Sequence, residues 1–170
     1  MTLVKEQEKS IESRLLEIRD TFPMFKDLPY GQLKNLMFSM VEIKMKKGDY
    51  LYKRGQPAEH CWILGEGMFR LSFMQEWEGM GDRDGYRKVC RIWDQAPWGM
   101  LGHHTFGLGK TTYEEDCRCT APARLWKLSS TTLTIINSCE PTQAKFQAYC
   151  QKFEQALDSQ KALIKKQYDK

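Results

Sequence analysis

The sequence predicts an α+β protein in which an antiparallel, jelly-roll-like β-roll of about eight strands is flanked by helices at both ends. Helical spacing of apolar residues is confined to the two ends of the chain. The middle contains short runs of aromatic and branched residues, separated by glycine or proline. A chain of 170 residues has room for one domain of ordinary size plus a helix or two.

The N-terminal part, residues 1–43, is predicted to be helical. In the first helix the apolar positions are Ile11, Leu15, Ile18 and Phe22. They recur at steps of three or four residues with charged residues between them, and Pro23 ends the run. A second, shorter helix is predicted over 31–41, because Leu33, Leu36, Met37 and Met40 share one face.

The β-roll is predicted over residues 44–128, where the periodicity changes. The strand-like runs lie at 50–52, 62–64, 68–73, 89–93, 117–120 and 124–128. Between the third and fourth of these, residues 75–87 contain three glycines and are typical of an exposed hairpin loop. Short strands with glycine or proline turns between them favour a compact roll.

The C-terminal part, residues 129–170, returns to helical spacing. Ser129 and Ser130 are suited to cap a short helix, Pro141 is expected to end it, and Thr142 is expected to cap a long last helix. The last helix carries an apolar stripe of Phe146, Tyr149, Cys150, Phe153, Leu157, Ile164 and Tyr168.

The two terminal helices are expected to contact other chains. A helix of about 26 residues is about 40 Å long, more than a roll of this size covers. The side chains expected to face partners are Ile11, Leu15, Ile18, Leu157, Ile164 and Tyr168. The partners are therefore expected to be proteins of a larger complex.

Composition and charge exclude several classes of protein. Hydrophobic residues make up 41% and charged residues 28%, the balance of a soluble globular domain. No apolar run approaches the roughly 20 residues of a membrane helix, and the charged first 20 residues are unlike a secretory signal. We expect an intracellular, cytoplasmic protein. The basic residues behind the net charge of +4 are spread out, so no nucleic-acid partner is expected.

The six cysteines do not predict a metal site. Cys117 and Cys119 are separated by one residue, whereas a zinc clip usually has two to four residues between its cysteines. Most of the cysteines are expected to be reduced, buried small hydrophobes. His103 and His104 lie upstream, but no spacing supports a catalytic triad. We expect no catalytic residue, no metal and no enzyme activity.

Six segments within residues 22–137 share the order and spacing of one known family. They lie at 25–28, 47–51, 54–56, 62–71, 97–102 and 123–129. Together they resemble the cyclic nucleotide-binding domains of kinase regulatory subunits, gated channels and bacterial catabolite activators. Gly48, Gly55 and Gly67 fall at turns between the predicted strands, where a positive φ is needed. The resemblance implies that residues 97–116 form the family's phosphate-binding cassette.

In such a cassette the ligand's phosphate docks on backbone N–H groups at the start of a short helix. A glutamate just after the first glycine holds the ribose, and an arginine further on holds the phosphate. Here the candidate segment is Gly99, Met100, Leu101 and Gly102. In this register Met100 replaces the glutamate.

The arginine position has two possible registers. One places Lys110, Thr111 and Thr112 where the family has arginine, a small residue and threonine. The other places the acidic residues Glu114, Glu115 and Asp116 there, which would repel a phosphate. Losing the glutamate and weakening the arginine contact together cost affinity by roughly two to four orders of magnitude.

These departures favour a non-catalytic, degenerate member without the usual cAMP or cGMP binding. Such a protein would act as a structural or regulatory subunit of a larger assembly, with no cofactor. The alternative is a working sensor for a cyclic nucleotide or another nucleotide-like ligand, in which case cAMP or cGMP is the ligand.

Overall fold

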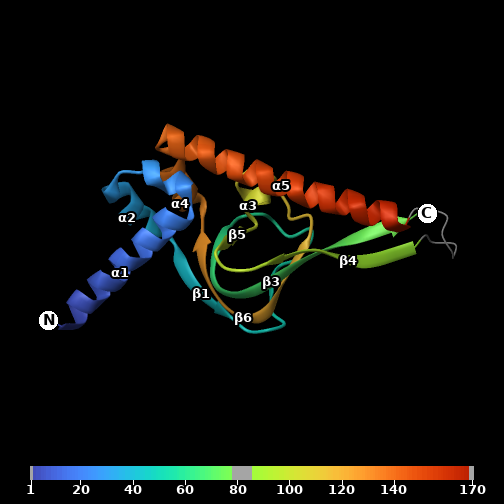
Figure 1. The fold of residues 1–170 in the computed structure, drawn as a ribbon, viewed down its shortest axis with the longest axis horizontal. Helices are drawn as coiled ribbons and strands as arrows, with labels where there is room; N and C mark the ends of the chain where they lie inside the picture. Colours follow the sequence, from blue (N-terminus) through green and yellow to red (C-terminus); the bar gives the residue numbers. More distant parts are fainter. Residues whose placement is uncertain (1, 78–85, 169–170) are drawn as a thin grey trace.

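The computed structural model describes the backbone of residues 2–77 and 86–168, and the side chains of residues 12–75 and 88–166. Helices gather at one end of the molecule, the sheet curls in the middle, and the last helix runs from the helical end over the sheet toward the tip of the β3–β4 hairpin (Figure 1). The helical end consists of α1 (Thr2–Thr21), a 3₁₀ turn (Pro23–Asp27), α2 (Tyr30–Ser39) and α4 (Ser130–Asn137).

Six strands in the described residues form one antiparallel sheet. They are β1 (Val41–Met45), β2 (Tyr50–Tyr52), β3 (Cys61–Trp77), β4 (Tyr86–Gln95), β5 (Gly99–Leu101) and β6 (Asp116–Leu128). The main order is β1-β6-β3-β4, while β2 pairs with β6 and β5 pairs with β3. The predicted α+β class and antiparallel roll are confirmed.

Two of the predicted strand breaks are bends within a longer strand. The runs at 62–64 and 68–73 belong to β3, and those at 117–120 and 124–128 belong to β6. The pairing of β3 with β6 shifts register between Leu64 and Phe69, which bends both strands without ending them. The roll therefore has fewer and longer strands than predicted.

Other boundaries also differ from the expected ones. β1 begins at Val41, before the expected start of the roll at 44. The paired strands β3 and β4 extend to Trp77 and Tyr86, so the expected hairpin loop is shorter, and residues 78–85 lie outside the described part. Pro141, expected to end the short helix, lies beyond it: α4 ends at Asn137, and Pro141 is in the first turn of the last helix, where its missing N–H costs nothing.

Two hydrophobic cores lie on opposite faces of the sheet. The helical core packs the helical end against the roll, and the roll interior lies inside the curl. The two cores share consecutive residues of one strand: Ile63 belongs to the helical core and Leu64 to the roll interior. This follows from the alternation of side chains along a strand.

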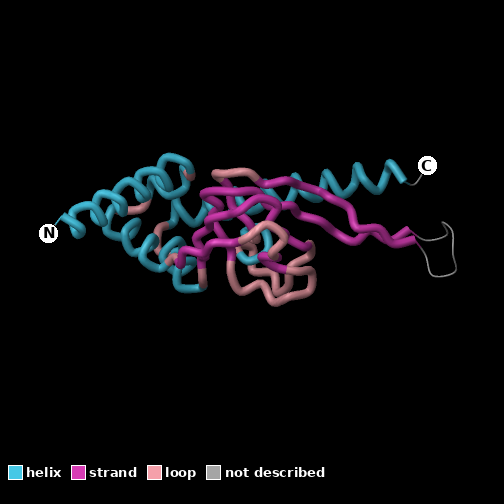
Figure 2. Tube along the Cα trace, turned by 90° about the horizontal axis from the view of Figure 1, so that it is seen from below, coloured by secondary structure: helices cyan, strands magenta, loops and turns pink. Residues whose placement is uncertain are grey.

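The last helix, α5 (Glu140–Tyr168), contributes to both cores. Phe146 and Cys150 are buried in the helical core, and Leu157 is buried in the roll interior. In Figure 2 the far half of the helix runs beside the extended β3–β4 hairpin. This hairpin lengthens the surface on which α5 rests. None of the described helices has the length and apolar character needed to cross a membrane.

The expected partner-facing stripes are therefore mostly covered by the chain itself. Leu15, Ile18 and Leu157 are only 1%, 3% and 1% exposed, so they cannot form a partner surface. Ile164 is half-buried and packs against the roll interior. The side chains of Ile11 and Tyr168 lie outside the described residues. The physical reason is that the 3₁₀ turn, α2 and the long hairpin supply covering surface that the sequence pattern did not reveal.

Gly67 offers a direct test of how β3 crosses β6. All three turn glycines have a positive φ, as predicted: 98° at Gly48, 88° at Gly55 and 97° at Gly67. A methyl group at Gly67 would lie 2.6 Å from the Pro122 carbonyl oxygen, whereas nothing lies within 4 Å of one at Gly55. We expect Gly67→Ala to lower the unfolding free energy in urea by about 2–4 kcal/mol, and Gly55→Ala by about 1–2 kcal/mol. Equal losses would contradict the close crossing at Gly67.

Candidate functional site

The cassette begins where β5 ends. β5 pairs with β3, which places Leu101 opposite Trp62. Gly102 then takes a φ of 74° and precedes the short helix α3 (His103–Phe106). A methyl group at Gly102 would lie 3.1 Å from the Trp62 ring. The chain can turn this sharply beneath Trp62 because position 102 is glycine.

The candidate segment from Gly99 to Gly102 lies in β5 and in the turn before α3. Met100 lies in β5, is 1% exposed and is buried in the helical core. Leu101 is fully buried in the roll interior, and Gly99 packs against the side chain of Gln95. In the register expected from the sequence, a buried methionine therefore stands at the position of the ribose-binding glutamate.

Lys110 is directed to the last helix. Its ammonium lies 2.5 Å from Glu154 on α5 and 3.6 Å from Glu114. Partial burial disfavours the charged ammonium, but the hydrogen bond and charge of Glu154, together with Glu114, outweigh it and raise the pKa of Lys110. The positive charge thus ties the cassette to α5.

Thr111 and Thr112 do not join Lys110 in a ligand site. Both are exposed. The carbonyl of Thr111 accepts a hydrogen bond from the backbone of Ala58, and Thr112 forms a β-bridge with Pro57. The structure therefore does not bring the expected Lys–Thr–Thr group together around one point.

The three acidic residues of the other register have three different environments. Glu114 is exposed, and Asp116 accepts a hydrogen bond from the backbone N–H of Arg54. Glu115 is fully buried in the molecule. Its Oε1 accepts a hydrogen bond of 2.8 Å from the Tyr52 hydroxyl and lies 2.6 Å from His104 Nε2. We call Tyr52, His104 and Glu115 the buried polar cluster.

The buried polar cluster contains an ionised carboxylate. Burial by itself favours the neutral acid, but the hydrogen bonds and charge of His104 and the hydrogen bond of Tyr52 outweigh it. The pKa of Glu115 therefore lies below its usual value. The same burial, next to Cys117 and Glu115, raises the pKa of Tyr52. At neutral pH the cluster combines an ionised carboxylate with a protonated phenol.

Side chains of α5 cover the short helix. The His103 ring lies 4.6 Å from the ring of Phe153 and 5.1 Å from that of Tyr149, measured between centroids. The His104 ring lies 5.1 Å from the Phe153 ring. Burial and the neighbouring His104 lower the pKa of His103 well below its ordinary value, so its imidazole is neutral. The first turn of α3 is thus covered by aromatic rings.

Sequence reasoning did not find the buried polar cluster. The two histidines were considered as partners of Cys117 and Cys119, whereas the structure pairs His104 with Glu115. Five of the six cysteines are buried, as expected for small hydrophobes. The described residues contain no group of three or more His, Cys, Asp or Glu side chains arranged to hold a metal ion.

Neither a protein-family model nor a curated protein sequence matches the chain. Solved structures do match. The sensor domain of the transcriptional regulator DNR from Pseudomonas aeruginosa has a TM-score of 0.66 at 18% identity, covering 89% of this chain and 95% of that one. The catabolite activator protein of Thermus thermophilus has a TM-score of 0.63 at 13% identity, covering 84% of this chain and 63% of that one.

A third match is the regulatory subunit of a cAMP-independent protein kinase A from Trypanosoma cruzi, solved with guanosine bound. Its TM-score is 0.66 at 15% identity, covering 94% of this chain and 52% of that one. The chain thus spans less than two thirds of the activator and of the kinase subunit. At these identities the likeness is one of fold. The chain therefore has the fold of the cyclic nucleotide-binding domains, the family that its sequence resembles.

Proposed function

We propose that this chain is a non-catalytic protein with a degenerate cyclic nucleotide-binding-like domain, acting as a structural or regulatory subunit of a larger assembly. The observation that carries the proposal is that the chain's own side chains occupy α3, the short helix on which family members bind phosphate. His104 of α3 is paired with the buried Glu115, and the rings of Tyr149 and Phe153 on α5 cover His103. A phosphate docking at the start of this helix would have to displace these contacts.

The packing of the roll interior supports the same proposal. The rings of Tyr52 and Tyr113 are stacked with centroids 4.0 Å apart, and Trp62 stacks on Tyr52 at 5.8 Å. All three are buried. Lys110, the candidate phosphate ligand, is committed to Glu154. A ligand entering here would have to displace both an aromatic stack and an ion pair.

A ligand sensor is the second candidate function, favoured by one hollow at the edge of this stack. The hollow has a volume of about 240 Å³ and is lined by Leu51, Tyr52, Gln56, Pro57, Glu59, His60, Trp62 and Tyr113. Aromatic walls suit a planar ring such as a nucleobase. The ligand in this case would be a cyclic nucleotide or a related nucleoside.

Calorimetric titration of the purified chain with cAMP, cGMP and guanosine separates the two functions. We expect no binding tighter than about 1 mM, a free energy of about −4 kcal/mol. Micromolar binding that Lys110→Ala abolishes would contradict the proposal and show a working cassette. Micromolar binding that survives Lys110→Ala but is lost in His60→Ala would instead support a sensor that uses the aromatic hollow.

A further inference from the structure

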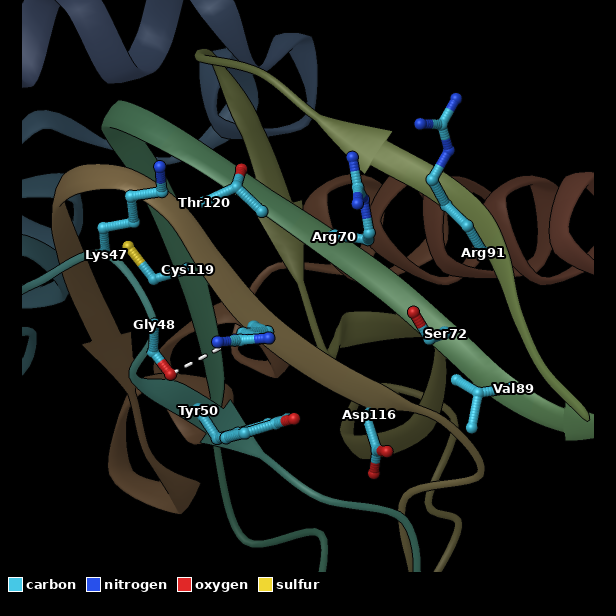
Figure 3. Close-up of a pocket in the computed structure, with 11 residues that line it drawn as sticks. Lys47, Gly48, Tyr50, Arg70, Ser72, Val89, Arg91, Asp116, Cys119 and Thr120 are labelled. Atoms are coloured by element: carbon cyan, nitrogen blue, oxygen red, sulfur yellow. Dashed lines mark hydrogen bonds between the residues drawn. The ribbon is translucent and has the colours of Figure 1, made fainter.

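A second concave surface lies on the outer face of the sheet. It has a volume of about 470 Å³ and is formed by the β1–β2 turn and by strands β2, β3, β4 and β6 (Figure 3). Arg70 and Ser72 line it, while Phe69 and Leu71, which alternate with them along β3, are buried in the roll interior. This outer groove is therefore on the opposite side of the sheet from the roll interior.

The outer groove is strongly basic. Four cationic side chains line it: Lys47, Arg70, Arg91 and Arg118. Asp116 is the carboxylate among the lining residues, and Asp94 beside the groove lies 3.1 Å from Arg70 and 3.5 Å from Arg91. The side chains of Arg70 and Arg91 are still 45% and 61% exposed. Among the side chains that the structure describes, the cations at the groove outnumber the carboxylates, so the groove keeps an excess of positive charge.

Two of these arginines come from directly opposed positions on neighbouring strands, and their side chains diverge. Arg70 on β3 is the register partner of Arg118 on β6. The Arg70 side chain reaches Asp94 on β4, whereas Arg118 lies over the Tyr50 ring at 5.6 Å and donates from Nε to the Gly48 carbonyl oxygen at 3.3 Å. The two guanidiniums are thus held toward opposite edges of the groove, where an extended acidic segment crossing the strands would meet both in turn.

We propose that the outer groove binds an acidic segment of a partner protein, a role that rests on the proposed function as a subunit. The cations come from the β1–β2 turn and from β6, β3 and β4, which lie side by side. Neighbouring strands are about 4.8 Å apart, so the groove spans about 15 Å, the length of four or five extended residues. A guanidinium pairs with a carboxylate through two parallel hydrogen bonds.

The carboxylates at the groove favour a peptide over a nucleic acid. Asp94 and Asp116 would repel a backbone that carries a phosphate at every step, whereas a peptide can place neutral residues opposite them. The Tyr50 ring is also engaged already, by Arg118 and by Lys53 at 4.7 Å, and so offers no free platform for stacking bases.

Fluorescence anisotropy with labelled peptides tests this assignment on the full chain. The probe is a peptide of alternating glutamate and glycine, and its control replaces every glutamate by glutamine. The chain variant carries Arg70→Ser and Arg118→Ser. The matched control carries Lys34→Ser and Lys152→Ser, which remove the same charge from exposed positions on α2 and α5.

We expect the glutamate peptide to bind and the glutamine peptide not to bind. The arginine variant should bind about tenfold more weakly, with the control variant close to the unmodified chain. Thermal unfolding of the arginine variant should stay close to that of the unmodified chain, because both side chains are exposed, and this separates lost binding from lost folding. Equal weakening in both variants, no binding of the glutamate peptide, or tighter binding of an oligouridylate of equal charge would each overturn the assignment. Calorimetric binding of cyclic nucleotides would instead contradict only the proposed function.

Discussion

Replacing Glu115 by alanine is expected to lower the free energy of unfolding by about 3 kcal/mol at pH 7. The substitution removes the acceptor of the Tyr52 hydroxyl and the partner of His104 Nε2, and it leaves both polar groups buried. Unfolding in urea, followed by circular dichroism, measures the loss. Glu114→Ala is the matched control, because the neighbouring Glu114 side chain is 53% exposed and its ion pair with Lys110 is worth little.

The Glu115 effect should also depend on pH with a defined sign. Its pKa is lower in the folded protein than the ordinary value of 4.5, so its contribution is complete above that value. The contribution is lost as the pH falls through the folded pKa. The stability difference between Glu115→Gln and the unmodified chain should therefore shrink below about pH 4.5. A difference that is the same at pH 7 and in acid would show that Glu115 is not held ionised.

Replacing Leu157 by alanine is expected to cost about 2–5 kcal/mol, the range for a fully buried leucine. Leu157 is 1% exposed and lies in the roll interior. The same substitution at Leu163, one and a half turns further along α5 and 55% exposed, should change stability by less than about 0.5 kcal/mol. Both variants are compared by thermal unfolding of the isolated chain.

The comparison of Leu157→Ala with Leu163→Ala shows what the last helix packs against. If α5 needed another chain to cover its far half, Leu157 would be exposed in the isolated protein. Both alanine variants would then unfold at the temperature of the unmodified chain. A loss confined to Leu157→Ala is the result expected from a helix docked on its own roll and hairpin.

Most of the fold could be predicted from the sequence, because the signals for helices, strands and turns are local. The glycines at 48, 55 and 67 predicted positions that need a positive φ, and all three have one. The length of the strands was harder to predict. The glycines at 65 and 67 are typical of a break between two strands. In the structure they instead allow β3 to bend over β6 with a shifted register. Whether a glycine ends a strand or bends it depends on the neighbouring strand.

The candidate site was less accessible to sequence reasoning, because it depends on contacts between distant segments. His104 and Glu115 come together only because the loop between them folds back. Lys110 forms its ion pair with Glu154, which lies on the last helix. The cross-strand pair of Arg70 and Arg118 likewise required the register of β3 with β6.

Amide hydrogen exchange of the free chain, with and without cAMP, tests the central claim of a filled roll most directly. The account predicts strong protection of α5 around Phe153 and Leu157 in the absence of ligand, because both residues pack on the roll. It also predicts that cAMP leaves this protection unchanged. Rapid exchange of these residues in the free chain, slowed when cAMP is added, would show an open roll that α5 closes on its ligand and would contradict the account.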